Sequence, residues 1–315
     1  MTLHVVLGAG GIGRSVAKTL ADAGDEVTLV SRSGRTIDRS GVRAVALDVT
    51  DAAGLAAVSA GARTVINALN PTAYTRWERD WPPMATAVLD ATEAAGARLV
   101  TVSNLYGYGP VTGPMTEDLP LSSTGVKGQV RAQMWRDAVA RQADGRVQVS
   151  EVRGSDYLGP ETLASSYLSS MVLPAVIAGR RARVPMGRAD VPHSWTFDGD
   201  VAALVAAIAL TDSDDVWGRA WHVPTDAPAT LAEVAALAAE VAGAPAPARL
   251  TVLPRALVSV GGLVVPLLGA LRETRHQFER PFVLDSTAAQ SRFGLRPTPL
   301  REAISRTVAA LRAAG

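Results

Sequence analysis

The chain has 315 residues, of which 48% are hydrophobic, and its 31 basic and 30 acidic residues give a net charge of +1. The length predicts one large or two modest domains, and the apolar content excludes a mainly disordered chain. Because the charges balance, we expect no nucleic-acid partner. The sequence has no cysteine, which excludes disulfide frameworks, thiolate metal sites and cysteine nucleophiles. The four histidines lack metal-binding spacing, so we expect no metal site.

The sequence offers no membrane-targeting segment. Its first residues predict a strand that enters a glycine loop, whereas a signal peptide has a basic region followed by an apolar one. The longest uncharged apolar run covers residues 256–271, which is 16 residues and less than the ~20 that a membrane-spanning helix needs. We expect this run to form a buried helix or the wall of an apolar pocket, and the protein to be cytoplasmic with no membrane partner.

Short apolar segments alternate with longer helical segments in the first half of the chain. The predicted strands cover or end at residues 5–7, 26–30, 42–47, 64–68, 98–103 and 147–152, and the predicted helices cover residues 12–20, 84–95 and 125–142. Strands that alternate with helices of this length indicate crossover connections and a parallel sheet covered on both faces. The sequence therefore predicts an α/β fold with a doubly wound parallel sheet of the Rossmann type.

A glycine pattern of the form GxGxxG follows the first predicted strand and opens the first helix. Its first glycine permits a tight turn, its second lets backbone approach a pyrophosphate, and its third lets helix and strand pack closely. The N-terminus of the helix then faces the phosphates. This context predicts a dinucleotide site, and a glycine turn in another kind of α/β protein is the alternative. The predicted contacts are Gly8, Gly10, Gly11, Ile12 and Gly13, with Ala68 at the end of the fourth strand.

The end of the second strand distinguishes the two nicotinamide cofactors. An NAD site has an acidic residue there to hold the ribose hydroxyls, whereas this chain has Ser31, Arg32 and Ser33. A guanidinium and two hydroxyls suit a 2′-phosphate, so we expect NADP(H) rather than NAD, with a solvated turn as the alternative. Asp48 follows the third strand and is expected to reach the adenine amino group or, alternatively, to cap the helix that starts near Thr50.

The alternation of strands and helices ends after residue 160. Helices and loops follow, with short strands predicted near residues 183–185 and 220–223. Thr230 is the expected N-cap of a helix over residues 231–242.

This change of pattern predicts two domains. We expect residues 1–160 to form the dinucleotide-binding domain, to which residues 190–222 return. Residues 161–189 and 223–315 are then a smaller substrate-binding domain.

Five segments resemble motifs of the extended branch of the short-chain dehydrogenase/reductase superfamily, the NAD-dependent epimerase/dehydratase-like proteins, and they occur in the order typical of that branch. The segments are VSNLYG at residues 102–107, RGSDYLGP at 153–160, WTFDGDVA at 195–202, WHVPT at 221–225 and FVLD through FGLRPTPL at 282–300. The resemblance covers nearly the whole chain. It implies a Rossmann fold, a nicotinamide cofactor, a small-molecule substrate and either a monomer or a homodimer.

The chain departs from this family at the motif that carries the chemistry. The family has a catalytic YxxxK, but Thr124 stands at the tyrosine position and Gly128 at the lysine position. Lys127 lies one residue earlier, in a segment that resembles the lysine-bearing helix of isoflavone reductases, which lack the tyrosine. Only Lys127 and Lys18 are lysines among 31 basic residues, and a lysine can titrate where an arginine cannot. We expect Lys127 to be catalytic and to contact the cofactor; a partly exposed surface lysine is the alternative.

Other candidate site residues follow the predicted strands. Tyr106 and Tyr108 follow the fifth strand, near the expected nicotinamide, and are further catalytic candidates with structural roles as the alternative. Ser103 is expected at the cofactor and Asn104 at a substrate carbonyl. The remaining candidate substrate contacts are Tyr157, His193 and Trp195, of which His193 is a lone histidine that can instead be structural.

These features predict an NADP(H)-dependent oxidoreductase that transfers hydride to or from a small, fairly apolar organic substrate, with Lys127 in place of the usual Tyr/Lys pair. One alternative is an NAD-dependent sugar epimerase or dehydratase. Another is a regulatory protein that binds NADP and catalyses nothing, which the missing tyrosine favours and the retained lysine opposes.

Overall fold

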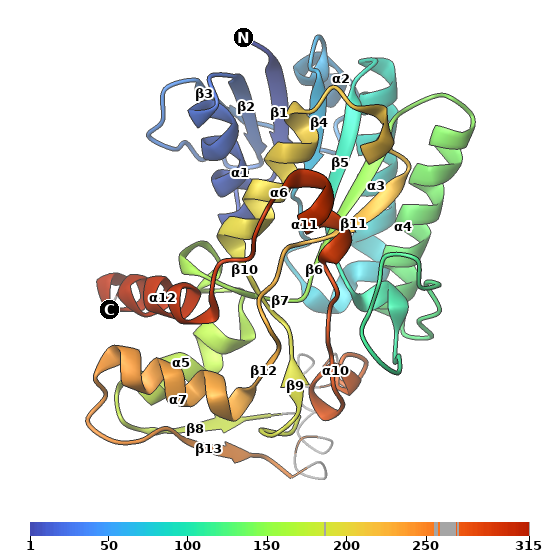
Figure 1. The fold of residues 1–315 in the computed structure, drawn as a ribbon. Helices are drawn as coiled ribbons and strands as arrows, with labels where there is room; N and C mark the ends of the chain where they lie inside the picture. The colour runs from blue at the N-terminus through green and yellow to red at the C-terminus, as the bar shows by residue number, and fades with distance from the viewer. Residues whose placement is uncertain (186, 255–257, 259–268, 270, 315) are drawn as a thin grey trace. The chain divides into compact units, whose positions relative to one another are not determined.

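The computed structural model describes residues 1–185, 187–254, 258, 269 and 271–314 (Figure 1). Most of the apolar run at residues 256–271 therefore lies outside the described residues. In the part that is described, no helix is long and apolar enough to cross a membrane.

The chain divides into two compact units. The first unit comprises Met1–Tyr108, Pro120–Arg153 and Val201–Val223, and the second unit comprises Gly109–Leu119, Gly154–Asp200 and Pro224–Gly315. Each unit therefore contains segments that are distant in sequence.

A seven-stranded parallel sheet forms the centre of the first unit. Its strands are β1 (Leu3–Leu7), β2 (Glu26–Ser31), β3 (Val42–Ala46), β4 (Thr64–Asn67), β5 (Arg98–Asn104), β6 (Val149–Gly154) and β11 (Arg219–His222). They lie in the order β11-β6-β5-β4-β1-β2-β3. The chain thus builds outward from β1 to β3 and then from β4 in the opposite direction. This arrangement confirms the predicted doubly wound Rossmann-type fold and places its switch point between β1 and β4.

Helices cover both faces of this sheet. They are α1 (Gly11–Asp22), α2 (Ala52–Ser59), α3 (Trp77–Ala94), α4 (Val126–Ala143) and α6 (Asp198–Leu210), with 3-10 turns η1 (Tyr74–Arg76), η2 (Tyr106–Tyr108) and η5 (Asp214–Val216). Figure 1 shows α1 and α6 on one face and α2, α3 and α4 on the other. On the second face, alternate strand residues such as Val5 and Leu7 pack against Leu55 and Val88. Each such buried side chain stabilises the fold by about 1.5–3 kcal/mol.

Helix α3 begins earlier than the sequence predicts. The expected start was residue 84, because Pro82 and Pro83 are poor residues for a helix interior, but the helix runs through both prolines from Trp77. Trp77 and Trp81 lie one turn apart and are both buried, with their rings edge to face at 6.2 Å. Burial of these two indoles offsets the backbone hydrogen bonds that the prolines cannot donate.

The second unit is built from helices and three two-stranded sheets. The sheets pair β7 (Asp156–Leu158) with β10 (Trp195–Phe197), β9 (Pro192–His193) with β12 (Ala229–Thr230), and β8 (Arg181–Val184) with β13 (Arg249–Val252). The helices are η3 (Pro160–Thr162), η4 (Leu168–Val172), α5 (Leu173–Ile177), α7 (Leu231–Ala242), α10 (His276–Glu279), α11 (Thr287–Phe293) and α12 (Leu300–Ala314). Thr230 caps α7 as predicted, in a reciprocal pair of hydrogen bonds with Glu233.

A buried carboxylate, Asp198, holds the start of η3. It accepts hydrogen bonds from the backbone N–H of Glu161 at 2.8 Å and from the hydroxyl of Thr162 at 3.2 Å. Gly159 lies so close that any side chain there would overlap the carboxylate. Burial raises the pKa of Asp198 to about 6, because desolvation of the charge outweighs the stabilising hydrogen bonds.

Asp198→Asn is therefore expected to stabilise the protein above neutral pH. Because the folded-state pKa lies above the unfolded value of 3.8, stability from this group is present at low pH and is lost as pH rises through about 6. The amide keeps an acceptor oxygen and removes the buried charge, so we expect a gain of roughly 1–3 kcal/mol in the free energy of unfolding at about pH 8.

Urea unfolding at about pH 5 and pH 8 measures this gain. Asp198→Ala is the control, because it removes the acceptor and should destabilise the protein at both pH values. An asparagine variant no more stable than wild type at the higher pH would contradict the prediction.

Candidate functional site

The loop from β1 to α1 approaches other backbone closely. Gly8 has a φ of +105°, and a Cβ there would lie 2.7 Å from the carbonyl oxygen of Ala68 at the end of β4. A Cβ on Gly13 would overlap the carbonyl oxygen of Gly8. These two glycines are therefore required for the packing of α1 against the sheet, as the GxGxxG pattern predicts.

Gly10 lies beside open space, unlike Gly8 and Gly13. Its φ of −71° is one that any residue type adopts, and a Cβ there would meet no atom within 4 Å. Gly10 is the N-cap of α1, and no side chain caps this helix. The first turn of α1, which begins with Gly11 and Ile12, thus presents backbone N–H groups beside open space, the arrangement that suits an anion.

A cleft of about 930 Å³ lies beside this loop, along the C-terminal ends of β1, β2 and β4. From the predicted cofactor contacts it brings together Gly8, Gly10, Ser31, Arg32, Ser33, Asp48 and Ala68. Its volume is in the range of cofactor sites, and it stands at the switch point of the sheet, where open α/β folds bind ligands.

The turn after β2 presents Arg32 and Ser33 to the cleft. The carbonyl of Ser31 accepts from the N–H of Gly34, and its hydroxyl accepts from the N–H of Arg35, both at 3.1 Å. Gly34 has a φ of +62°, which glycine adopts readily. The turn is thus fixed by its own backbone and by the Ser31 hydroxyl, and the side chains of Arg32 and Ser33 are left for the cleft.

Asp48 follows β3, the neighbour of β2 in the sheet, and lines the same cleft. Its Oδ1 accepts from the N–H and the hydroxyl of Thr50 at 3.0 and 2.7 Å. These hydrogen bonds, with the charge of Arg32, lower the pKa of Asp48, so it is ionised at neutral pH. The alternative that Asp48 caps the next helix is wrong, because Asp51 is the N-cap of α2 and accepts from Gly54 at 3.0 Å.

The cleft also holds charged residues that the sequence did not indicate. Arg76 and Arg79 line it from the start of α3 and share Asp80, at 3.6 and 2.7 Å. They were missed because α3 was predicted to begin beyond them. The charged side chains of the wall are Arg32, Arg35, Arg76, Arg79, Asp48 and Asp80. Four positive and two negative charges leave a balance of two positive charges, which attracts a ligand that carries several phosphates.

Lys127 lies on the first turn of α4 and is buried, with 6% of its surface exposed. Its ammonium stands 4.5 Å from the centre of the Tyr74 ring, a cation–π distance. The hydroxyl of Tyr74 donates to that of Tyr106 at 3.3 Å, and the ring of Trp77 stacks on Tyr106 at 5.8 Å. The alternative of a partly exposed surface lysine is therefore wrong. We call Tyr74 and Tyr106 the phenol pair; the sequence indicated Tyr106 but not Tyr74.

Gly128 explains the departure from YxxxK. A Cβ at this position would overlap the hydroxyl of Ser123 and the carbonyl oxygen of Tyr106. The start of α4 thus contacts the backbone of η2 directly, and no lysine fits at residue 128. The neighbouring Lys127 is the cation that this helix presents to the aromatic residues.

Tyr108 belongs to a buried polar network. Its hydroxyl accepts from Arg153 at 2.7 Å and lies 2.8 Å from Nε2 of His222. Arg153 also pairs with Glu151 at 2.6 Å. Burial opposes the charge of Arg153, but Glu151 and Tyr108 raise its pKa overall. In this network Tyr108 has a structural role, and a catalytic role for Tyr108 stays a prediction.

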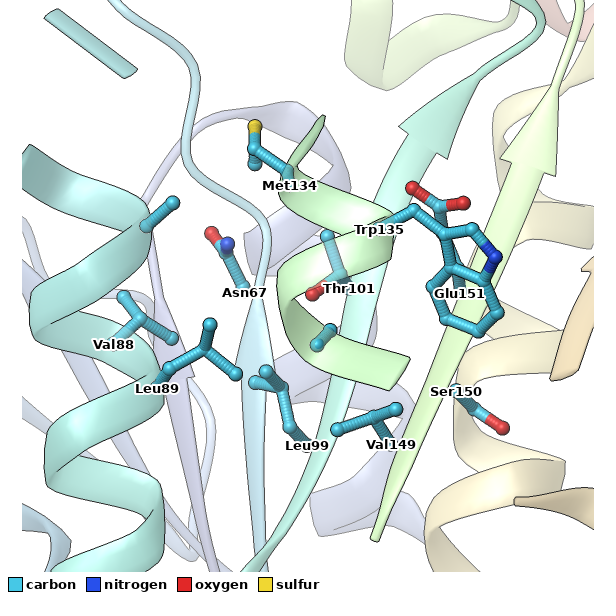
Figure 2. Close-up of a pocket in the computed structure, with 12 residues that line it drawn as sticks. Asn67, Val88, Leu89, Leu99, Thr101, Met134, Trp135, Val149, Ser150 and Glu151 are labelled. Carbon is cyan, nitrogen blue, oxygen red and sulfur yellow. The ribbon is translucent and has the colours of Figure 1, made fainter. Parts of the chain in front are cut away.

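A small cavity lies beneath α3 and α4 (Figure 2). Asn67, Leu99, Trp135 and Glu151 are among its lining residues, and its volume is about 20 Å³. A cavity of roughly this size holds one water molecule. It is therefore too small to be a ligand site.

The remaining predicted residues are divided between the two units. Ser103 and Asn104 end β5 in the first unit, and Oδ1 of Asn104 accepts from the N–H of Tyr106 at 3.1 Å. Ser103 and Lys127 do not line the cleft described above. In the described residues no cluster of three His, Asp or Glu side chains is placed to bind a metal.

The candidate substrate residues of the second unit surround a buried histidine. His193 lies 2.9 Å from Asp156 through Nε2 and 3.0 Å from the carbonyl of Gln277 through Nδ1. The indole of Trp195 donates to the carbonyl of Ala229 at 3.0 Å. Both side chains thus hold the second unit together, and their contact with a substrate stays a prediction.

Tyr157 stands on β7 of the second unit. Its ring lies 2.7 Å from where a Cβ on Gly154 would be, so Gly154 leaves room for it. Tyr157 is half-buried.

Comparison with known proteins supports the dinucleotide assignment. Residues 8–145 match a family model described as NAD(P)H-binding. The matched segment contains the glycine loop, the arginine turn and Lys127. No curated protein matches the chain significantly in sequence.

Solved structures of similar fold extend over the whole chain. dTDP-glucose 4,6-dehydratase of Streptomyces venezuelae, with NAD bound, has 19% identity and a TM-score of 0.76, covering 99% of this chain and 97% of its own. UDP-glucuronic acid 4-epimerase of Bacillus cereus, with UDP-glucuronic acid and NAD, has 14% identity and a TM-score of 0.79, covering 100% of both chains. An epimerase of Methanothermobacter thermautotrophicus has 16% identity and a TM-score of 0.81, covering 99% and 92%.

These findings confirm the predicted resemblance. Residues 8–145 are similar to NAD(P)H-binding domains, and the chain has the fold of the NAD-bound epimerases and dehydratases named above.

Proposed function

We propose that this chain is an NADP(H)-dependent oxidoreductase that acts on a small, fairly apolar organic substrate. The observation that carries the proposal is the arginine turn after β2, which lines the same cleft as the glycine loop. No acidic residue stands at residues 31–35, where an NAD site has one.

The residues of the cleft fit this cofactor. The N-terminus of α1 beside Gly10 would hold the pyrophosphate, and Arg32 with Ser33 would hold the 2′-phosphate. Asp48, ionised after β3, would accept a hydrogen bond from the adenine amino group. When bound, NADPH supplies a hydride, which is a proton with two electrons, to a substrate carbon, and NADP⁺ accepts a hydride in the reverse direction.

The acid–base part of the chemistry requires Lys127. Its burial against the phenol pair concentrates one positive charge where water screens it little. Within the second unit, Tyr157, His193 and Trp195 are the residues we assign to substrate binding. Asn104 stays a separate candidate in the first unit. We expect a cytoplasmic monomer or homodimer.

An assay of NADPH consumption distinguishes this function from two others. The structures of similar fold carry NAD and nucleotide sugars, so a sugar epimerase or dehydratase would bind NAD and leave NADPH unconsumed. A regulatory protein would bind NADPH and consume none. Purified protein mixed with NADPH and a panel of carbonyl, imine and enone compounds separates these outcomes, because only an oxidoreductase lowers the NADPH absorbance.

The first prediction concerns the 2′-phosphate. Arg32→Ala should weaken NADPH binding by ~1–3 kcal/mol, the scale of a charge-assisted hydrogen bond, and leave NADH binding nearly unchanged. Calorimetric titration with both cofactors measures the difference. Arg39→Ala is the matched control, because Arg39 pairs with Asp22 and does not line the cleft. Equal losses for NADH and NADPH would refute the assignment.

The second prediction concerns the pyrophosphate. Gly10→Val should abolish dinucleotide binding without unfolding the protein, because the new side chain enters the open space at the N-terminus of α1. Gly10→Ala, with a smaller side chain, should weaken binding less. Fluorescence titration reports binding and thermal unfolding reports the fold. Normal binding by the valine variant would mean that the phosphates lie elsewhere.

The third prediction concerns Lys127. Lys127→Ala should lower kcat by ~10²–10⁴, the usual range for an acid–base group. It should also cost about 1–2 kcal/mol of stability, because a buried cation–π contact is lost. Lys18→Ala is the matched control, since Lys18 is exposed on α1 and should have no effect. Turnover of Lys127→Ala near that of wild type would exclude a catalytic role.

A further inference from the structure

The phenol pair is assembled at one edge of the sheet. Tyr74 lies on η1 after β4, and Tyr106 lies on η2 after β5. Because β4 and β5 are parallel neighbours, the segments that leave their C-terminal ends meet at the same edge. The hydrogen bond of 3.3 Å between the two hydroxyls follows from this topology.

The phenol pair adjoins the cofactor cleft. Thr72 and Arg76 line the cleft, and Tyr74 lies between them in the chain with Lys127 over its ring. The arginine turn is on the β2 side of the switch point, whereas the phenol pair is on the β4 and β5 side. A dinucleotide crosses such a switch point with one half on each side, so we expect its reactive half on the side of the phenol pair.

Two cations face this cluster. Lys127 from α4 lies directly over Tyr74, and Arg131, one turn later on α4, lies 5.0 Å from the Trp77 ring. Trp77 from α3 contacts both phenols, with ring centres at 5.4 Å from Tyr74 and 5.8 Å from Tyr106. Lys127 and Arg131 are both buried, so the positive charge of Lys127 acts on the Tyr74 ring with little screening by water.

We propose that Tyr74 and Tyr106 act as one proton-carrying group, in which Tyr106 exchanges a proton with the substrate oxygen and Tyr74 stabilises the Tyr106 phenolate. The hydroxyl of Tyr74 donates to the Tyr106 oxygen, so Tyr74 is placed to stabilise negative charge on that oxygen. This inference rests on the proposed function, because reduction of a carbonyl group places one proton on its oxygen.

The proton step balances with water as the only other reactant. In the reducing direction, the O–H bond of Tyr106 breaks as an O–H bond to the substrate oxygen forms. The resulting phenolate keeps the hydrogen bond from Tyr74 and the nearby charge of Lys127. Tyr106 is half-buried, and water returns its proton. In the oxidising direction each bond change is reversed. Lys127 is then a positioning residue whose charge acts on both phenols.

Turnover of phenylalanine variants tests the pairing. Tyr106→Phe should lower kcat by ~10²–10⁴ and Tyr74→Phe by about 10- to 100-fold, with calorimetric NADPH affinity unchanged in both. The double variant should be no slower than Tyr106→Phe, because Tyr74 acts only through Tyr106. Lys127→Arg should recover part of the turnover that Lys127→Ala loses, since it keeps a positive charge near the ring. Tyr167→Phe, in the second unit, is the matched control and should leave turnover unchanged.

A titration without cofactor or substrate tests the same pair independently. The ultraviolet absorbance of tyrosinate, taken as wild type minus the double variant, isolates the two phenols. We expect this difference to titrate at lower pH in wild type than in Lys127→Met, because the ammonium that favours the phenolate is removed. We also expect the two phenols to titrate as a coupled pair, so that either single variant shifts the remaining one.

The outcomes separate this inference from the proposed function. Wild-type turnover by Tyr74→Phe, or a double variant slower by the product of the single losses, would overturn the pairing while leaving the oxidoreductase intact. A protein that consumes no NADPH would overturn the proposed function. In that case the absorbance titration still tests the pairing. Two phenols that titrate independently, with midpoints unchanged by Lys127→Met, would overturn the pairing as well, and two phenols that titrate as a coupled pair would support it.

Discussion

The start of α4 meets the backbone of η2, and the positions of Lys127 and the phenol pair depend on this contact. Gly128 permits it, because any side chain there would overlap the carbonyl oxygen of Tyr106. The close approach turns Lys127 inward, where its ammonium covers the ring of Tyr74. It also fixes η2, so that the hydroxyl of Tyr106 lies within reach of Tyr74. A single absent side chain thus determines where a buried cation and two phenols lie.

The cofactor cleft depends on the close approach of helix α1 to the strands of the sheet. Gly8 and Gly13 bring α1 against the ends of β1 and β4, so the helix N-terminus opens directly into the cleft. The surrounding charges then select among anions. Arginines from two segments that are far apart in sequence, the turn after β2 and the start of α3, stand on the cleft wall with only two carboxylates. A wall with this balance of charge attracts a ligand that carries phosphate groups.

The fold is shared with NAD-dependent epimerases and dehydratases at 14–20% identity, and the differences lie in the side chains at the ends of the strands. In the family the acid–base tyrosine and lysine are four residues apart on one helix. Here the helix lacks that tyrosine and has no room for that lysine. We infer that the phenols come from the loops after β4 and β5 instead, and that only the cation comes from the helix. Function is carried by such sites and not by the scaffold.

The sequence by itself determined the sheet, the glycine loop and the arginine turn, because each depends on local pattern: apolar alternation, GxGxxG spacing and the residues directly after a strand. It also singled out Lys127, since lysine is rare in this chain. Only the tertiary structure decided that Lys127 is buried, that Tyr74 covers it, that Arg76 and Arg79 reach the cleft, and that Asp51 rather than Asp48 caps α2. These facts depend on where η1 and α3 begin and on which segments meet across the sheet edge. The contacts of Tyr74 with Tyr106 and Lys127 join residues that are distant in sequence. Burial of Trp77 and Trp81, not local helix propensity, sets the start of α3.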